Sequence, residues 1–118
     1  MADNPRSSEP APDPLGRLWP VAFRWLHNSL SIRHADTVDV KFALSTPGEP
    51  EQEKVIALNH AHLLAAARKT GTALSDAWCM KLGGLHLRRM IESFEDMDKT
   101  LVDLSVEDLE GYAAQLRN

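Results

Sequence analysis

The chain has 118 residues, enough for one domain with its own core, and its 43% hydrophobic and 25% charged content is ordinary for a globular protein. The formal net charge of −4 argues against a protein that binds polyanions nonspecifically. No stretch approaches the roughly 18 apolar residues that a membrane-spanning helix needs. Cys79 is the only cysteine, which excludes an internal disulfide.

The first 14 residues are rich in proline, serine and acidic residues. They offer almost no apolar side chain to bury, which predicts a disordered tail over residues 1–14. A secretory signal peptide would begin with a basic segment and an apolar run, and neither is present. We therefore expect a cytoplasmic protein with a single mostly helical domain over residues 15–118.

The segment after this tail predicts an amphipathic helix. Apolar residues recur at intervals of four, three and four, the spacing of one helical face: Trp19, Phe23, Leu26 and Leu30. Pro20 fits the first turn of a helix, where a missing N–H costs nothing. We expect a helix over about 20–28, with Trp25 about 100° away from the main stripe.

Residues 30–44 change to a period of two. Val38, Val40, Phe42 and Leu44 alternate with less apolar residues, as is typical of a half-buried strand. A shorter alternation over 30–33 precedes them. A β-hairpin over 30–44 is predicted, and it must pack on helices or on another chain because an isolated hairpin is marginally stable.

The rest of the chain predicts three more helices. One covers about 51–70, with Gly71 as its C-terminal cap. A second runs from about 72 or 75 to 94, and Gly83-Gly84 within it indicates a kink, a break or a close helix crossing. The last follows Ser105, which forms a pattern like a capping box with Asp108.

The predicted fold class is therefore mainly α. We expect about four helices packed as a small bundle, with one short β-hairpin around residues 30–44.

Catalytic and metal-binding patterns are absent from the sequence. His60 and His62 would point about 200° apart on a helix, and no two histidines have the i, i+4 spacing of a helical zinc pair. His86 has no acidic residue nearby in the sequence to orient it. Cys79 lies among apolar residues, where cysteine behaves as a buried hydrophobe. We expect no enzyme activity, no metal and no cofactor.

A DNA-binding regulator is the alternative function. Residues 63–80 read as a helix, a turn at Gly71 and a second helix, the outline of a helix-turn-helix unit. The second helix would present Ser75, Asp76 and Lys81, which is too little positive charge for strong phosphate contact.

Protein interaction is the function class that the sequence favours. The chain has three tryptophans, and aromatic residues and arginines dominate interface energetics. The predicted partner-binding residues are Trp19, Phe23, Arg24 and Trp25. Trp19 and Phe23 also fit the domain's own core, and Trp25 fits a core position or an external contact equally well.

The charges and the predicted hairpin suggest how such a module associates. Residues 15–35 carry three arginines and no acid before Asp36, while residues 92–110 carry eight acids and one base. These two segments could attract each other within one molecule or between copies, and an unpaired strand edge could pair with another chain. We expect a non-enzymatic accessory or regulatory subunit that self-associates or binds a protein partner, without membrane contact.

Overall fold

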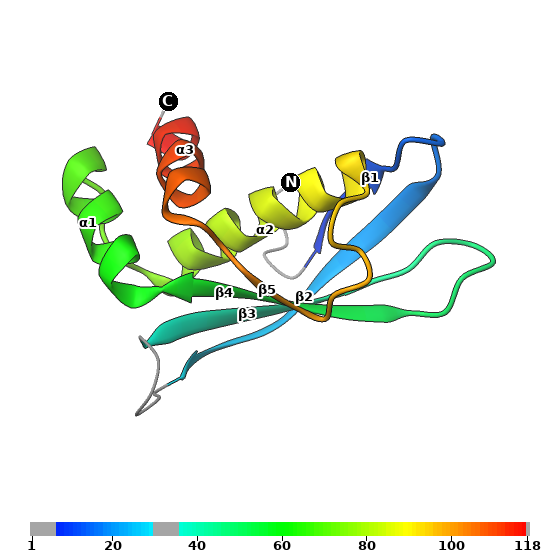
Figure 1. Cartoon of the computed structure of the whole chain (residues 1–118), viewed down its shortest axis with the longest axis horizontal. Coiled ribbons are helices and arrows are strands. Elements are labelled where there is room, and N and C mark those ends of the chain that lie inside the picture. The colour runs from blue at the N-terminus through cyan, green and yellow to red at the C-terminus, as the bar shows by residue number, and fades with distance from the viewer. Residues whose placement is uncertain (1–6, 30–35, 118) are drawn as a thin grey trace.

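The computed structural model describes residues 7–29 and 36–117, which form a curled mixed sheet and three helices (Figure 1). The elements in chain order are β1 (Ser7–Pro12), β2 (Leu18–Ser29), β3 (Thr37–Leu44), β4 (Gln52–Asn59), α1 (His60–Thr70), α2 (Asp76–Ser93), β5 (Leu101–Asp103) and α3 (Val106–Arg117). None of these helices combines the length and apolar composition needed to cross a membrane.

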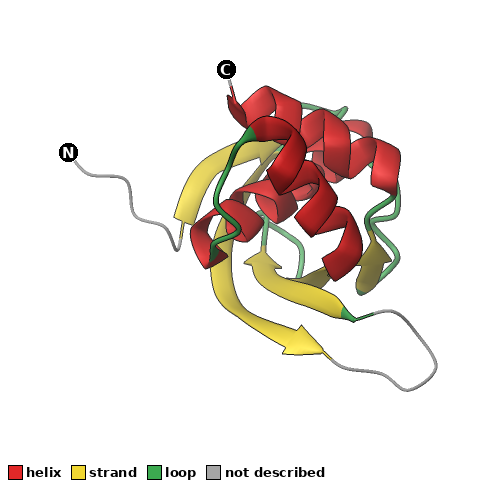
Figure 2. Cartoon of the chain, turned by 90° about the vertical axis from the view of Figure 1, so that its left-hand side faces the viewer, coloured by secondary structure: helices red, strands yellow, loops and turns green. Residues whose placement is uncertain are grey.

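The sheet has the strand order β1-β2-β3-β4-β5. The first four strands form an antiparallel meander, and β5 joins β4 in parallel. All three helices lie on the same side of the sheet, which curls around them (Figures 1 and 2). The sheet therefore has an inner face toward the helices and an outer face on which no described helix packs.

The expectation of a mainly α, four-helix protein is wrong. Residues 18–29 form the longest strand, β2, where a helix was expected over about 20–28. The spacing of Trp19, Phe23 and Leu26 fits a helical stripe, but a β-bulge between Phe23 and Trp25 produces the same spacing in a strand. The extra residue changes the alternation, so that Trp19, Phe23 and Leu26 all pack on the inner side.

The predicted helix over 51–70 is correct only in its second half. Residues 52–59 form β4, in which Lys54, Ile56 and Leu58 alternate toward the inner face. The helix α1 begins only at His60, because the Asn59 side chain accepts a hydrogen bond from the backbone N of His62 at 3.1 Å. The apolar composition of both halves hides this boundary in the sequence.

Of the two strands expected in a hairpin over 30–44, the second is present in the structure. Residues 37–44 form β3, and its partners are β2 and β4. The other expected arm, residues 30–35, lies outside the described residues. Of the residues expected in an N-terminal tail, 7–12 form β1 and pair with β2; the division into a tail and one domain from residue 15 otherwise stays a prediction.

The helix caps were predicted well. Gly71 has the left-handed backbone, with φ of 66°, that ends α1. The Ser105 hydroxyl accepts a hydrogen bond from the Asp108 N at 3.2 Å and starts α3. The helix expected up to about 94 is α2, which runs through Gly83-Gly84 without a break.

The core lies between α2 and the inner face of the sheet. Its fully buried apolar side chains come from the central strands and all three helices, and they include Val40, Ile56, Leu58, Leu63, Leu82, Leu87, Ile91 and Leu109. Burying each such side chain contributes about 1.5–3 kcal/mol relative to leaving it exposed. This packing holds the sheet in its curl and fixes which residues face outward.

Candidate partner-binding surface

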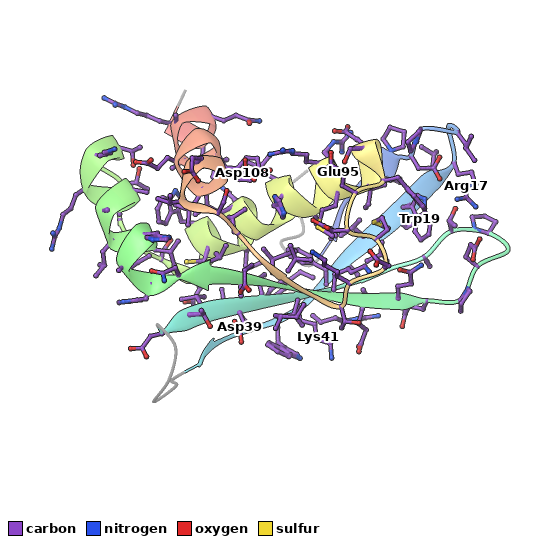
Figure 3. All side chains as sticks on the ribbon, viewed as in Figure 1. Arg17, Trp19, Asp39, Lys41, Glu95 and Asp108 are labelled. Atoms are coloured by element: carbon purple, nitrogen blue, oxygen red, sulfur yellow. The ribbon has the colours of Figure 1, made fainter. Side chains whose placement is uncertain are left out.

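Trp19 belongs to the core. Its side chain is 1% exposed, and its indole Nε1 donates to Asp13 Oδ2 at 3.1 Å. The Arg17 guanidinium lies over the indole ring, 5.7 Å from the centroid, and the Phe94 ring lies at 6.3 Å. Figure 3 shows Trp19 and Arg17 at the end of the molecule where β2 begins.

Asp13 organises the turn that places Trp19. It accepts hydrogen bonds from the backbone N of Leu15 and Arg17, both at 2.9 Å, and from Arg17 Nε at 2.8 Å. Burial alone would raise the pKa of Asp13, but the hydrogen bonds from Trp19, Arg17 and the backbone lower it to about 2. The carboxylate is thus a fixed anchor for the β1–β2 connection.

Phe23 and Trp25 lie on opposite sides of the sheet. Phe23 is half-buried and meets Phe42 edge to face, with ring centroids 6.1 Å apart. Two residues apart in a regular strand, the two aromatics would share a face. The bulge at Arg24 changes the register, so that Trp25 pairs with Lys41 on the outer face and Leu26 pairs with the buried Val40.

Trp25 is held on the outer face by its cross-strand neighbours. The Lys41 ammonium lies 5.4 Å from the centroid of the Trp25 ring, a cation–π contact. Lys41 Nζ also meets Glu53 Oε1 on β4 at 3.1 Å. Arg24 pairs with Glu51 at 3.4 Å. Figure 3 shows Lys41 and Asp39 on the side of the sheet away from the helices.

A cross-strand row runs through the centre of the outer face. The register places Trp25 beside Lys41, Lys41 beside Val55, and Val55 beside Leu101. The two ends of this row expose large apolar groups, with Trp25 38% and Leu101 57% exposed. We call Trp25, Lys41, Val55 and Leu101 the central row. It gives the outer face a continuous, partly apolar strip across four strands.

The edges of the sheet are poor places for another strand to pair. The edge strand β1 contains Pro10 and Pro12, which cannot donate a backbone hydrogen bond, and it carries a bulge between Ser8 and Ala11. The other edge, β5, has only three residues. Association through a strand edge, one of the routes expected from the sequence, is therefore less favourable than association through the outer face.

A cluster of polar side chains connects α2 to α3. His86 Nδ1 lies 2.9 Å from the Tyr112 hydroxyl, and Arg89 Nη1 donates to Asp108 Oδ1 at 2.8 Å. Burial lowers the pKa of His86 and raises that of Tyr112. The hydrogen bond from Arg89 lowers the pKa of Asp108. A cavity of about 120 Å³ lies beside this cluster and is lined in part by His86, Arg89 and Asp108. The hydrogen bond and the ion pair join the two helices.

Cys79 and the possible metal-ligating side chains were the other candidates for catalysis or metal binding. Cys79 is buried, and burial raises the pKa of its thiol to about 11, which disfavours the nucleophilic thiolate. Within the described ranges 7–29 and 36–117, no three His, Cys, Asp or Glu side chains gather in an arrangement that could hold a metal ion.

Three basic side chains of the helix pair considered for DNA binding are engaged in ion pairs, and the second helix packs on the core. Trp78, Cys79 and Leu82 of α2 are buried against the core. The three ion pairs join Lys69 with Glu110, Arg88 with Glu92, and Arg89 with Asp108. These pairs reduce the positive potential that phosphate binding needs.

The basic and acidic segments do not pair with each other in the ion pairs of the described residues. Arg17 and Arg24 pair with Asp13, Glu49 and Glu51. Acids of the 92–110 segment pair with bases of α1, α2 and their own loop. Arg33, the third base of the first segment, lies outside the described residues.

Comparison with known proteins finds no matching family model, no matching curated protein and no matching solved structure. Function must therefore be inferred from the geometry of this chain alone. Of the four predicted partner-binding residues, only Arg24 and Trp25 lie together on the outer face; Trp19 and Phe23 pack inward. Sequence reasoning missed Lys41, Val55 and Leu101, because their proximity to Trp25 depends on strand pairing.

Proposed function

We propose that this chain is a non-enzymatic protein-interaction module, a small accessory or regulatory subunit that binds its partner through the outer face of the sheet. The observation that carries the proposal is the position of Trp25. The bulge at Arg24 places this large aromatic ring outside the core, where the Lys41 ammonium contacts its face. Tryptophan is among the residue types most enriched at the positions that dominate interface binding energy.

The surroundings of Trp25 support the same function. Arg24 is exposed beside it, and Leu101 is 57% exposed at the other end of the central row. A typical interface combines an apolar centre with a polar rim. Here the apolar strip is bordered by Arg24, Glu53 and Asp103, all exposed.

Site-specific photo-crosslinking tests the proposal. A benzophenone amino acid is placed at position 101 in one variant and at position 64 in another, so that Trp25 is kept, and each variant is irradiated in the cells that make the protein. Leu64 on α1 is a matched control because it is, like Leu101, an exposed leucine (37% against 57% exposed), but lies away from the outer face. A discrete crosslinked species is expected from position 101 alone. The absence of any crosslink from position 101 would contradict the proposal.

The DNA-binding alternative remains testable by a gel shift with generic duplex DNA at low salt. Even nonspecific DNA-binding proteins bind under that condition. We expect no shift, because the second helix presents little positive charge and Lys69, Arg88 and Arg89 form ion pairs with acidic side chains.

A further inference from the structure

We propose that a cavity at the start of α2 binds a carboxylate that carries a short apolar body. α1 and α3 pack side by side at the end of the molecule where α2 begins (Figure 1). The cavity is lined by residues of α2, of the loop before it and of the end of α3. It lies on the helical side of the sheet, so this proposal goes beyond the proposed function of the outer face and does not depend on it.

The cavity has the volume and the apolar lining of a small-molecule site. Its volume is about 310 Å³, at the lower end of the range of roughly 300–1,000 Å³ that is typical of ligand pockets. Its apolar lining consists of Ala73, Ala77, Leu116 and the ring of Trp78. A ligand with a short apolar chain or a small ring matches this volume and this lining.

The indole N–H of Trp78 faces the cavity without an acceptor. Trp78 is 6% exposed and lines the cavity, but its Nε1 donates to no other group of the described residues. Among those residues, the only fully enclosed side-chain nitrogen or oxygen that lacks a partner is Nδ1 of His62. Nε1 of Trp78 is therefore open to the cavity. A donor on so buried a side chain is normally paired, as Trp19 is with Asp13.

Lys81 adds a positive charge that no acid neutralises. It is exposed, lines the cavity and takes part in none of the ion pairs of the described residues. Neighbours three and four positions away on a helix share a face, and here they are Ala77, Trp78, Gly84 and Leu85. The helix therefore offers its ammonium no carboxylate partner.

The polar groups of the cavity are suited to an anion. The Lys81 ammonium and the Trp78 indole N–H can only donate hydrogen bonds. The Ser75 hydroxyl accepts from the backbone N of Trp78 at 3.2 Å, which leaves its own proton free to donate. Asp76, the next residue, does not line the cavity. A carboxylate has two acceptor oxygens for these donors, and its pairing with Lys81 is charge-assisted.

Titration with hexanoate, followed by proton–nitrogen correlation NMR, tests the site. The chain has three tryptophans, and the indole signal that Trp78→Phe removes is that of Trp78. We expect this signal to move downfield as its N–H gains an acceptor, with a dissociation constant on the order of millimolar. The signal of Trp19, which already donates to Asp13, should stay in place. Hexylamine, which has the same chain with a positive charge, should leave both signals unchanged.

Two substitutions at exposed positions test the charge and the space separately. Lys81→Met keeps the apolar stem without the charge and should raise the dissociation constant of hexanoate at least about fivefold. Ala77→Leu extends a side chain into the cavity from a helix position and should abolish binding. Lys99→Met is the control, because it removes the charge of an exposed lysine in the loop before β5 and should leave binding unchanged. Circular dichroism checks that each variant is folded.

A peptide C-terminus presents the same carboxylate as a free acid, and N-acetyl-glycyl-leucine distinguishes the two sources. Tighter binding of this peptide than of hexanoate would assign the site to a chain terminus, and the reverse order would assign it to a free acid. Three results would overturn the proposal: a Trp78 signal that does not move at hexanoate concentrations well above the expected dissociation constant, an equal shift with hexylamine, or unchanged hexanoate binding in Lys81→Met or Ala77→Leu.

Discussion

Gly83 of α2 lies directly against Val40 of β3: a Cβ atom added at Gly83 would lie 3.3 Å from the Val40 Cβ. It would also lie 3.4 Å from Cε2 of Phe42, so both neighbours belong to the inner face of the sheet. The Gly-Gly pair that the sequence flagged as a kink, a break or a close crossing is thus a close approach of a continuous helix to the sheet.

This contact predicts opposite effects for neighbouring substitutions. Gly84→Ala should raise the free energy of unfolding by up to about 1 kcal/mol, because alanine favours the helix and a Cβ there lies 4.0 Å from Phe42. Gly83→Ala gains the same helix propensity but must push α2 away from β3, so it should be about 1–3 kcal/mol less stable than Gly84→Ala. Urea denaturation of both variants gives the comparison. Equal stability would mean that α2 shifts on the sheet without cost.

Asp13 should make the protein sensitive to acid. Its pKa is about 2 in the folded protein and near the ordinary 3.8 when unfolded. The contribution of the ionised Asp13 carboxylate to the free energy of unfolding is therefore fully present above about pH 4, and it is lost as the pH falls through 2. In Asp13→Asn this part of the acid dependence should disappear, and the variant should be less stable at neutral pH.

The control for Asp13 is Glu49→Gln, which removes the other, exposed partner of Arg17 at 3.4 Å. Thermal unfolding at pH 7, 4 and 2 compares the three proteins. If Glu49→Gln altered the acid dependence as much as Asp13→Asn, the turn around Asp13 would not be the source.

The sequence predicted the helix ends better than the strands, for a physical reason. Caps such as Gly71 and Ser105 act through backbone groups a few residues away, so their signal is local. The strand β2 was misread because its bulge gave apolar residues a helical spacing. The three-residue β5 carries no periodic signal and exists only because β4 and the core hold it.

The same distinction holds for the candidate surface. Trp25 could be named from the sequence because its residue type alone marks it as an interface candidate. Val55 and Leu101 could not, because they become its neighbours only through the pairing register of four strands. Register depends on contacts between distant segments, which one sequence does not specify.

Lys54 holds the loop before β5 from inside the protein. Its side chain is buried, and its Nζ donates to the carbonyl oxygens of Met97 and Lys99, both at 2.5 Å. Burial lowers the pKa of Lys54, but the two carbonyls satisfy its ammonium. Lys54→Met keeps the apolar stem and removes both hydrogen bonds, which should cost about 1–3 kcal/mol of stability.

Hydrogen exchange gives the local readout for Lys54. The Val55 N–H, which donates to the Thr100 carbonyl at 2.7 Å, should exchange faster in Lys54→Met. Lys99→Met is the control, because Lys99 is exposed and pairs only with Asp96 among the ion pairs of the described residues. Unchanged exchange at Val55 in Lys54→Met would show that the Lys54 hydrogen bonds do not hold β5 on β4.

His86 should make the protein less stable below neutral pH. Burial lowers the pKa of His86 below its ordinary value of 6.5; nearby Asp108 opposes the shift, and Arg89 adds to it. The unfolded chain therefore takes up a proton near pH 6.5 that the folded protein does not. Stability is complete above about pH 7 and falls as the pH drops through 6.5 toward the folded-state pKa.

Substitutions at His86 and Tyr112 distinguish two contributions to stability, the protonation of His86 and its hydrogen bond with Tyr112. Tyr112→Phe should lose about 1–3 kcal/mol at pH 7.5, because it removes the hydroxyl 2.9 Å from His86 Nδ1. His86→Gln should shrink the difference in unfolding free energy between pH 7.5 and 5.5. Urea denaturation at both pH values measures it, and a wild-type difference in His86→Gln would place the titrating group elsewhere.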